Sequence, residues 1–288
     1  MKSGETVYRC RARGVFKERG IKPAVGDRVE IAIGEEEDNS TVTEILPRKN
    51  VFVRPFVANV DCFVVVTSIA GPAPAFQTID RFLVMAEKAD TDIVICLSKC
   101  DLADPEGRGG ARKAAKSLET LKEIYSPVYP VVCVGSDSDD GIEELLQHIK
   151  GKRAALAGAS GVGKSTLLNR IMPDAGMETG AIHEKSQRGK HTTRHSQLFT
   201  VPVKGCGDAG DTMIFDTPGF TSFDIMEADE EELQHLYPEI GKHAGKCRYD
   251  NCRHIAEPGC AVKEALSRGE ISESRYESYK LQMEEIKR

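Results

Sequence analysis

The chain has 288 residues, of which 40% are hydrophobic and 29% charged, with a formal net charge of −6. This composition is typical of a globular chain of two or three domains and excludes a disordered or fibrous one. No segment approaches the roughly 18 apolar residues of a membrane helix, and the first ten residues lack the apolar core of a signal peptide. We therefore expect a cytoplasmic protein without a membrane partner.

Nine cysteines are present, and their scatter indicates reduced thiols rather than a disulfide framework. Six stand singly, four of them within segments that read as strands or buried runs. These six are Cys10, Cys62, Cys96, Cys100, Cys133 and Cys206.

Residues 1–55 predict a β-domain. Segments 8–11, 28–33 and 41–45 alternate apolar and polar side chains, with glycines and prolines between them. Five short strands in this length are typical of a small closed barrel of the OB type. A basic run suits RNA phosphates, although solvated side chains on the outer face of a barrel would give the same pattern. Its members are Arg9, Arg11, Arg13, Lys17, Arg19 and Lys22, with Arg48, Lys49 and Arg54 nearby.

Residues 56–225 predict an α/β domain with a buried parallel sheet. Apolar runs at 62–67 and 92–97 read as strands, and 78–88 has the apolar period of a helix. Such sheets are covered by helices on both faces and bind ligands at the carboxyl ends of their strands. The segment SKCD at 98–101 follows the second strand, so it lies where a ligand is expected.

The SKCD segment suits a guanine base. The Asp101 carboxylate can accept hydrogen bonds from guanine N1–H and the 2-amino group, while the Lys99 stem packs along the ring. Adenine has an acceptor at N1 and no 2-amino group, so a carboxylate built for guanine would reject it. Ser98, Lys99 and Asp101 are therefore candidate nucleotide-binding residues. The alternative is that Asp101 only caps the residues that follow it.

A basic amphipathic helix at 108–126, a strand at 128–134 and a helix at 142–149 come next. The loop between the last two contains Gly135 and Ser136. In a guanine site this loop would present backbone N–H groups to the base O6, which makes Ser136 a further nucleotide-binding candidate.

Residues 153–170, RAALAGASGVGKSTLLNR, carry the strongest functional signal. A buried strand leads into a glycine-rich turn and a helix, with the spacing of a phosphate-binding loop. Lys164 would reach the β and γ oxygens of a nucleotide, and the Ser165 hydroxyl would ligate Mg²⁺. An ordinary glycine-rich turn is the alternative. The expected GTP-binding residues of this loop are Gly158, Ala159, Ser160, Gly161, Val162, Gly163, Lys164, Ser165 and Thr166.

Residues 174–200 are polar and without a strong period, so we expect a mobile segment. Thr192 or Thr193 within it would complete the coordination of Mg²⁺ when a γ-phosphate is present. A plain surface loop is the alternative.

Residues 213–215 read as a strand that leads into the sequence DTPG. Asp216 would hold the Mg²⁺ shell through water, and the Gly219 N–H would bind GTP by sensing its γ-phosphate. Phe220 follows, where many GTP-binding switches have a Gln that orients the attacking water. Because an apolar ring cannot align water, we expect slow hydrolysis by the chain alone.

Residues 226–288 predict a helical domain that binds zinc. Cys247, Cys252, His254 and Cys260 offer three thiolates and one imidazole within 14 residues, enough for a closed tetrahedral Zn²⁺ site. Free thiols are the alternative, because the spacing differs from that of two CxxC knuckles. A closed set leaves no position for substrate, so the metal would be structural.

A last helix is predicted at 272–287. Its stripe of Tyr276, Tyr279, Met283 and Ile286 at helical spacing favours core packing. Basic side chains in this domain are candidates for contact with rRNA, or else solvated charges. They are Arg253, Lys263, Arg268, Arg275 and Lys280.

The order of the motifs is rotated relative to most GTP-binding switches, in which the phosphate loop comes first and K-x-D last. Here K-x-D lies at 99–101, the phosphate loop at 158–165 and DTPG at 216–219, which indicates a circular permutation. Over nearly its whole length the chain resembles the bacterial small ribosomal subunit biogenesis GTPase family (RsgA). The shared motifs are VGDRV at 25–29, NVD at 59–61, IDRFLV at 79–84, GASGVGKST, GKHTT, DTPGF and CRYDNCRHIAEPGC.

This resemblance implies a multidomain fold with an OB-type barrel, a P-loop GTPase sheet in permuted order and a helical zinc domain. The implied ligands are GTP or GDP, Mg²⁺ and one structural Zn²⁺ per chain. His191 is implied to orient the attacking water once a partner orders its loop, although a structural or surface histidine is the competing interpretation. Ser98 stands where the family has Asn, and Gly135 where it has Ser.

The implied activity is slow GTP hydrolysis that the small ribosomal subunit stimulates. A monomer would bind 16S rRNA in the GTP state late in assembly and leave after hydrolysis. Two rival functions stay open: an RNA-binding assembly factor with nucleotide as a structural ligand only, and an ATP-using kinase or ATPase. The guanine-specific chemistry of Asp101 argues against the second.

Overall fold

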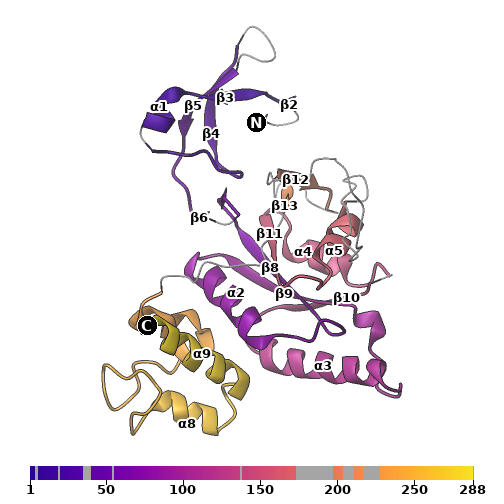
Figure 1. Cartoon of the computed structure of the whole chain (residues 1–288), viewed down its shortest axis with the longest axis vertical. Coiled ribbons are helices and arrows are strands. Elements are labelled where there is room, and N and C mark those ends of the chain that lie inside the picture. The colour runs from indigo at the N-terminus through magenta and orange to yellow at the C-terminus, as the bar shows by residue number, and fades with distance from the viewer. Residues whose placement is uncertain are drawn as a thin grey trace, which may run out of the picture.

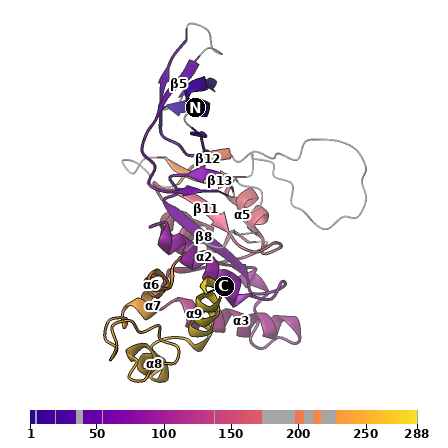
Figure 2. The same ribbon diagram turned by 60° about the vertical axis from the view of Figure 1, so that its left-hand side comes forward.

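The computed structural model describes residues 1–3, 6–18, 20–34, 40–53, 55–136, 138–172, 197–203, 211–216 and 228–287. Three parts follow one another along its long axis. A β-module formed by the N-terminal residues lies at one end, a six-stranded sheet with its helices lies in the middle, and a helical C-terminal module lies at the other end (Figure 1). The view in Figure 2 shows the same order. The predicted fold class is confirmed.

The N-terminal module contains the strands β1 (Lys2–Ser3), β2 (Thr6–Val7), β3 (Cys10–Ala12), β4 (Val29–Ala32), β5 (Ser40–Ile45), β6 (Val51–Phe52) and β7 (Val57–Ala58). In its three-stranded sheet, β3 runs parallel to β5, and β4 runs antiparallel to β5. A short helix, α1 (Gly14–Glu18), was not expected from the alternating pattern. Its Phe16 side chain is buried, which anchors the helix to the module.

The central sheet contains the strands β8 (Cys62–Ser68), β9 (Asp92–Ser98), β10 (Val131–Val134), β11 (Arg153–Ala157), β12 (Gln197–Val201) and β13 (Thr212–Asp216). Their spatial order is β10-β9-β8-β11-β13-β12. All neighbours are parallel except β12, which is antiparallel to β13. All seven residues of β8 are buried, as expected for a parallel strand covered on both faces.

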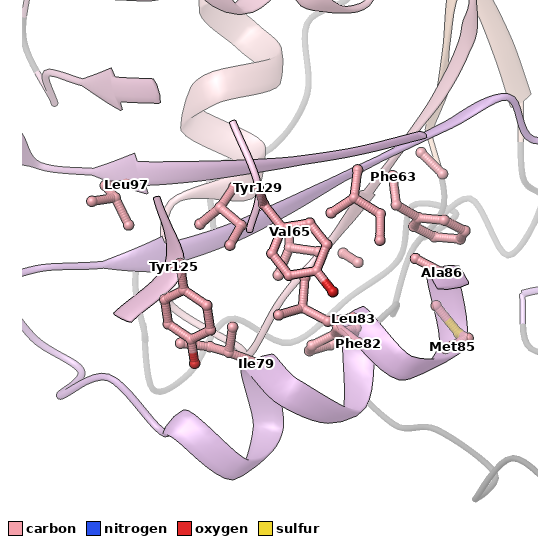
Figure 3. Packing of buried hydrophobic residues seen from close by; sticks show 14 of the residues in the cluster. Phe63, Val65, Ile79, Phe82, Leu83, Met85, Ala86, Leu97, Tyr125 and Tyr129 are labelled. Atoms are coloured by element: carbon pink, nitrogen blue, oxygen red, sulfur yellow. The ribbon is translucent and has the colours of Figure 1, made fainter. Parts of the chain in front are cut away.

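Within the described residues, four helices cover this sheet: α2 (Phe76–Lys88), α3 (Gly110–Tyr125), α4 (Ile142–His148) and α5 (Lys164–Ile171). Helices α2 and α3 bury their apolar sides on one face, where Phe63 and Val65 of β8 pack against Phe82 and Leu83 of α2 (Figure 3). Helices α4 and α5 pack on the opposite face. Because side chains alternate along a strand, β8 contributes to both cores.

Two predicted elements differ from the structure. The segment predicted to be mobile, 174–200, ends in β12, which its pairing with β13 holds in place. Strand β10 begins at Val131 rather than at residue 128. The preceding residues turn instead, because the N–H groups of Val128 and Tyr129 donate to the carbonyl of Tyr125.

The C-terminal module contains the helices α6 (Glu230–Leu233), α7 (Pro238–Gly241), α8 (Ala261–Ser267) and α9 (Glu273–Ile286), and the 3-10 turn Gln234–Leu236. Its core includes Tyr276, Tyr279 and Met283 of α9, as the predicted stripe indicated. Val84 of α2 belongs to the same core. The module is therefore packed onto the central domain through α2.

A buried ion network fixes this contact. The Arg275 guanidinium lies 2.8 Å from the carboxylate of Asp80 on α2 and 2.6 Å from that of Glu239, and the Arg275 side chain is 1% exposed. The guanidinium also lies 4.4 Å from the ring centroid of Tyr237. The prediction that Arg275 is available to rRNA or solvent is therefore wrong.

Among the described residues, no helix combines the length and apolar character that crossing a bilayer requires. None of the eight cysteines in these ranges forms a disulfide with another described residue. Cys206, and Arg19 and Arg54 of the basic run, lie outside the described residues.

Replacing Arg275 with Met tests the ion network. We expect the free energy of unfolding to fall by about 3–5 kcal/mol, because Asp80 and Glu239 would keep buried charges without a cation. Chemical denaturation followed by circular dichroism measures this change. The matched control is Arg268→Met, at an exposed arginine of the same module, which should keep the midpoint of the unmodified protein. Equal midpoints for the two variants would contradict the role given to Arg275.

Candidate functional site

Four parallel strands end at one edge of the central sheet and bring the predicted segments together. Strand β9 ends at Ser98, β10 ends before Gly135, and β11 ends at Ala157, before the phosphate loop. Strand β13 ends at Asp216, and its Phe215 pairs with Ala155 of β11. Because parallel strands end on the same side of a sheet, the base, phosphate and magnesium segments converge although the chain visits them in rotated order.

The phosphate loop, residues 158–165, has the backbone that its glycines predict. Gly158, Gly161 and Gly163 have φ of 151°, 79° and 98°. A Cβ on Gly158 would lie 2.2 Å from the carbonyl oxygen of Val66, so only glycine fits there. Gly163 caps α5, which directs the N-terminus of that helix at the loop.

Lys164 turns its amine into this loop. The Nζ atom donates to the carbonyls of Gly158 at 2.6 Å and Ala159 at 2.7 Å. No carboxylate is among these two partners, and burial lowers the pKa of Lys164 to about 8. The arrangement suits an amine that exchanges carbonyl oxygens for phosphate oxygens when an anion arrives.

Ser98 and Lys99 tie the SKCD segment to the phosphate loop. The buried Ser98 hydroxyl donates to the Val162 carbonyl at 2.6 Å. The Lys99 amine donates to the carbonyls of Ala70 at 3.2 Å and Gly161 at 3.5 Å. The sequence predicted packing of the Lys99 stem on a base, but it gave no signal for these contacts of the amine.

The Asp101 carboxylate is held by Ser136. One oxygen accepts the Ser136 backbone N–H, and the other accepts the Ser136 hydroxyl at 2.6 Å. Burial acts to raise the pKa of Asp101, but the hydrogen bonds from Ser136 outweigh it, so the pKa lies below its ordinary value. The lowered pKa keeps the carboxylate ionised at neutral pH, and an ionised carboxylate has acceptor sites for further donors. Position 135 is a glycine and offers no hydroxyl. The hydroxyl that donates to Asp101 is that of the next residue, Ser136.

The remaining predicted site residues are only partly described. Ser165 lies in the first turn of α5, and the backbone of Asp216 ends β13. The Asp216 side chain lies outside the described residues. His191, Thr192, Thr193 and Gly219 lie outside them altogether, so their roles stay predictions.

The four predicted metal ligands meet in the C-terminal module. Cys247, Cys252, His254 and Cys260 place one ligand atom each within 4.8 Å of one another. The His254 Nδ1 lies 3.4 Å from the Sγ atoms of Cys247 and Cys260, and those sulfurs are 3.9 Å apart. A tetrahedral zinc ion needs edges of about 3.5 Å between nitrogen and sulfur and about 3.8 Å between sulfurs. The donor set therefore fits zinc.

A second contact orients the imidazole of this cluster. The other ring nitrogen of His254, Nε2, lies 2.9 Å from the side-chain oxygen of Gln234. With Nδ1 facing the sulfurs of Cys247 and Cys260, Nε2 would carry the proton and donate a hydrogen bond to Gln234. Such outer contacts fix the ring of a histidine ligand in metal sites.

Comparison with known proteins places this geometry in a family. Residues 45–226 match the family model described as RsgA GTPase, and residues 1–42 match the RsgA N-terminal domain. The chain belongs to the RsgA GTPase family. Membership implies a guanine nucleotide and Mg²⁺ as ligands and GTP hydrolysis as the activity.

Relatives of the RsgA family match nearly the whole chain. The small ribosomal subunit biogenesis GTPase RsgA of Agathobacter rectalis is 44% identical, covering 99% of this chain and 89% of the relative. Among solved structures, YjeQ from Thermotoga maritima has a TM-score of 0.79 at 38% identity, covering 96% of this chain and 89% of that one. YloQ, described as a circularly permuted GTPase, has a TM-score of 0.76 at 33% identity, covering 98% and 87%. The predicted permutation is confirmed.

The pKa of Lys164 predicts how nucleotide binding depends on pH. With a pKa of about 8, the amine is protonated below pH 8 and loses its charge above it. We therefore expect the Kd for GDP to be about tenfold higher at pH 9 than at pH 7, measured by isothermal titration calorimetry. The variant Lys164→Arg stays charged and should show a much flatter profile. A Kd that does not change with pH in the unmodified protein would contradict the prediction.

Proposed function

We propose that this chain is a GTPase that acts in late assembly of the small ribosomal subunit. It binds the 16S rRNA of that subunit in the GTP state and leaves after hydrolysis. The observation that carries the proposal is the joint presence of a guanine-type carboxylate and a phosphate loop at one sheet edge, in a chain whose near full-length relatives bear the name small ribosomal subunit biogenesis GTPase. We assign its site of action to the cytoplasm, and its working form to a monomer.

In this proposal the two halves of the site divide the nucleotide between them. Asp101 accepts the N1–H and the 2-amino group of guanine, and Lys164 binds the β- and γ-phosphates. Mg²⁺, held by Ser165, Asp216 and Thr192 or Thr193, would neutralise charge on those phosphates. The Gly219 N–H reports the presence of the γ-phosphate.

Hydrolysis needs an aligned water molecule. Phe220 offers no hydrogen bond at the position after DTPG, so we assign the alignment to His191. An imidazole that is neutral near pH 7 can accept a proton from water. In this proposal His191 aligns the water only when the small ribosomal subunit is bound, so the unassisted reaction is slow.

We further propose how the modules share the contact with RNA. The predicted domains 1–55, 56–225 and 226–288 serve as RNA-binding barrel, GTPase and zinc domain. Exposed arginines of the first module suit phosphate contacts, and the four-ligand cluster holds one structural zinc ion. The exposed arginines are Arg9, Arg11 and Arg13.

GTP turnover with and without purified ribosomal subunits tests the proposed function. We expect small subunits to raise kcat by at least about tenfold and large subunits to leave it unchanged. The variant His191→Ala should lose the stimulation and keep its Kd for GTP. If a GTP-locked form and the GDP form bind the small subunit equally well, the nucleotide is only a structural ligand, and the proposal fails.

Replacing Asp101 with Asn tests whether this carboxylate recognises the guanine base. An amide presents one donor and one acceptor, which match the N1–H and 2-oxo groups of xanthine rather than the two donors of guanine. We expect the Kd for GDP to rise by about 100-fold and the Kd for xanthosine diphosphate to fall. Competition against a fluorescent GDP analogue measures both. An unchanged preference for GDP would show that Asp101 does not contact the base.

A further inference from the structure

The loop that carries Ser136 is closed by hydrogen bonds between its own residues. We call residues 135–141 the base loop. Within it, the Gly135 N–H donates to the Asp140 carbonyl at 3.4 Å, and the Ser138 hydroxyl donates to the Asp140 carboxylate at 2.6 Å. These bonds close the loop on itself. They do not fix its position relative to the phosphate loop.

Arg170 of α5 holds the base loop in place relative to the phosphate loop. Its Nη1 donates to the Gly135 carbonyl at 3.1 Å and also to the Ser138 carbonyl. The Arg170 side chain is 19% exposed, so these bonds are partly shielded from water. Its Nη2 lies 3.9 Å from Asp139, whose side chain is 94% exposed, and such an exposed pair contributes little.

One peptide group connects Arg170 to Asp101. The carbonyl of Gly135 and the N–H of Ser136 belong to the same planar unit. Arg170 donates to the carbonyl oxygen of this peptide group, and the N–H of the same group donates to the Asp101 carboxylate. A peptide bonded at both ends is polarised along its length, so the cation strengthens the N–H as a donor and fixes the plane in which it points.

The helix that carries Arg170 begins in the phosphate loop. Helix α5 starts at Lys164, and Arg170 lies six residues later in its last turn. A displacement of the phosphate loop would therefore carry Arg170 with it. Through Gly135 and Ser136, the base acceptor is held relative to the phosphate site by a route independent of the Ser98 hydroxyl.

We propose that Arg170 is a positioning residue for guanine recognition: it orients the Gly135–Ser136 peptide so that Ser136 holds Asp101 in the plane of the base. The proposal rests on the proposed function, because it takes Asp101 as the guanine acceptor. In this proposal Arg170 acts through the Gly135 and Ser138 carbonyls and does not itself contact the base or the phosphates. Its loss should therefore affect nucleotide selection and KM, and not kcat at saturating GTP.

The variant Arg170→Gln tests this role in the full-length chain. Kd values for GDP and inosine diphosphate are measured by competition against a fluorescent GDP analogue. Inosine lacks the 2-amino group and so gives Asp101 one donor instead of two. We expect the Kd for GDP to rise about tenfold, the size of one lost hydrogen bond to a charged group, and the preference for GDP over inosine diphosphate to shrink.

Two further variants complete the test. Arg170→Lys keeps a cation near the same carbonyls without the planar fork, and should give a KM for GTP between those of the unmodified and Gln proteins, with kcat unchanged. Arg81→Gln removes an arginine of α2 that pairs with Glu285, and should bind nucleotide as the unmodified protein does. If the Gln variant does not fold, an unchanged KM in the Lys variant overturns the proposal.

The outcomes separate the two assignments. If the unmodified protein prefers GDP and Arg170→Gln keeps that preference, even with both Kd values raised equally, Arg170 is only structural and this proposal fails alone. If the unmodified protein does not distinguish the two nucleotides, Asp101 does not read the 2-amino group. The guanine assignment then fails first, and this proposal fails with it.

Discussion

The hydrogen bond from the Ser98 hydroxyl to the Val162 carbonyl joins the two halves of the candidate nucleotide site. These residues are 64 positions apart in the sequence, and they meet because only β8 separates β9 from β11 in the sheet. The bond is buried, so water does not compete for it. The bond fixes the distance between the phosphate loop and the segment that carries the candidate base acceptor, Asp101. A fixed distance suits a nucleotide, because its ribose holds base and phosphates a constant length apart.

A circular permutation leaves this spacing intact, because the sheet depends on which strands are neighbours and not on the order in which the chain makes them. Strand β11 lies between β8 and β13 here, with β10 and β12 at the edges. The permutation changes what is attached to the sheet. The N-terminal module leads into β8, and β13 ends 12 residues before Ala228 of the C-terminal module, so the sheet connects directly to both.

Local patterns predicted what depends on local chemistry. Apolar periods located most strands and helices, and the glycine spacing located the phosphate loop, because these signals need no distant partner. Arg275 was misassigned to the surface because its partner Asp80 lies 195 residues away. Strand β12 was missed because its order comes from pairing with β13. The contacts of Lys99 and Arg170 with backbone carbonyls have no motif, since a carbonyl is present at every residue.

In the proposed function the modules share the contact with RNA, so the separation of the two outer modules at opposite ends of the molecule bears on how the chain dissociates (Figure 1). Two weak binding contacts held at a fixed distance give avidity, because formation of the first contact raises the effective concentration of the second. Linkage of this kind raises affinity by about 10²–10⁴-fold without any new contact. Under that proposal, a change in the angle of one module would remove this gain in affinity and favour dissociation.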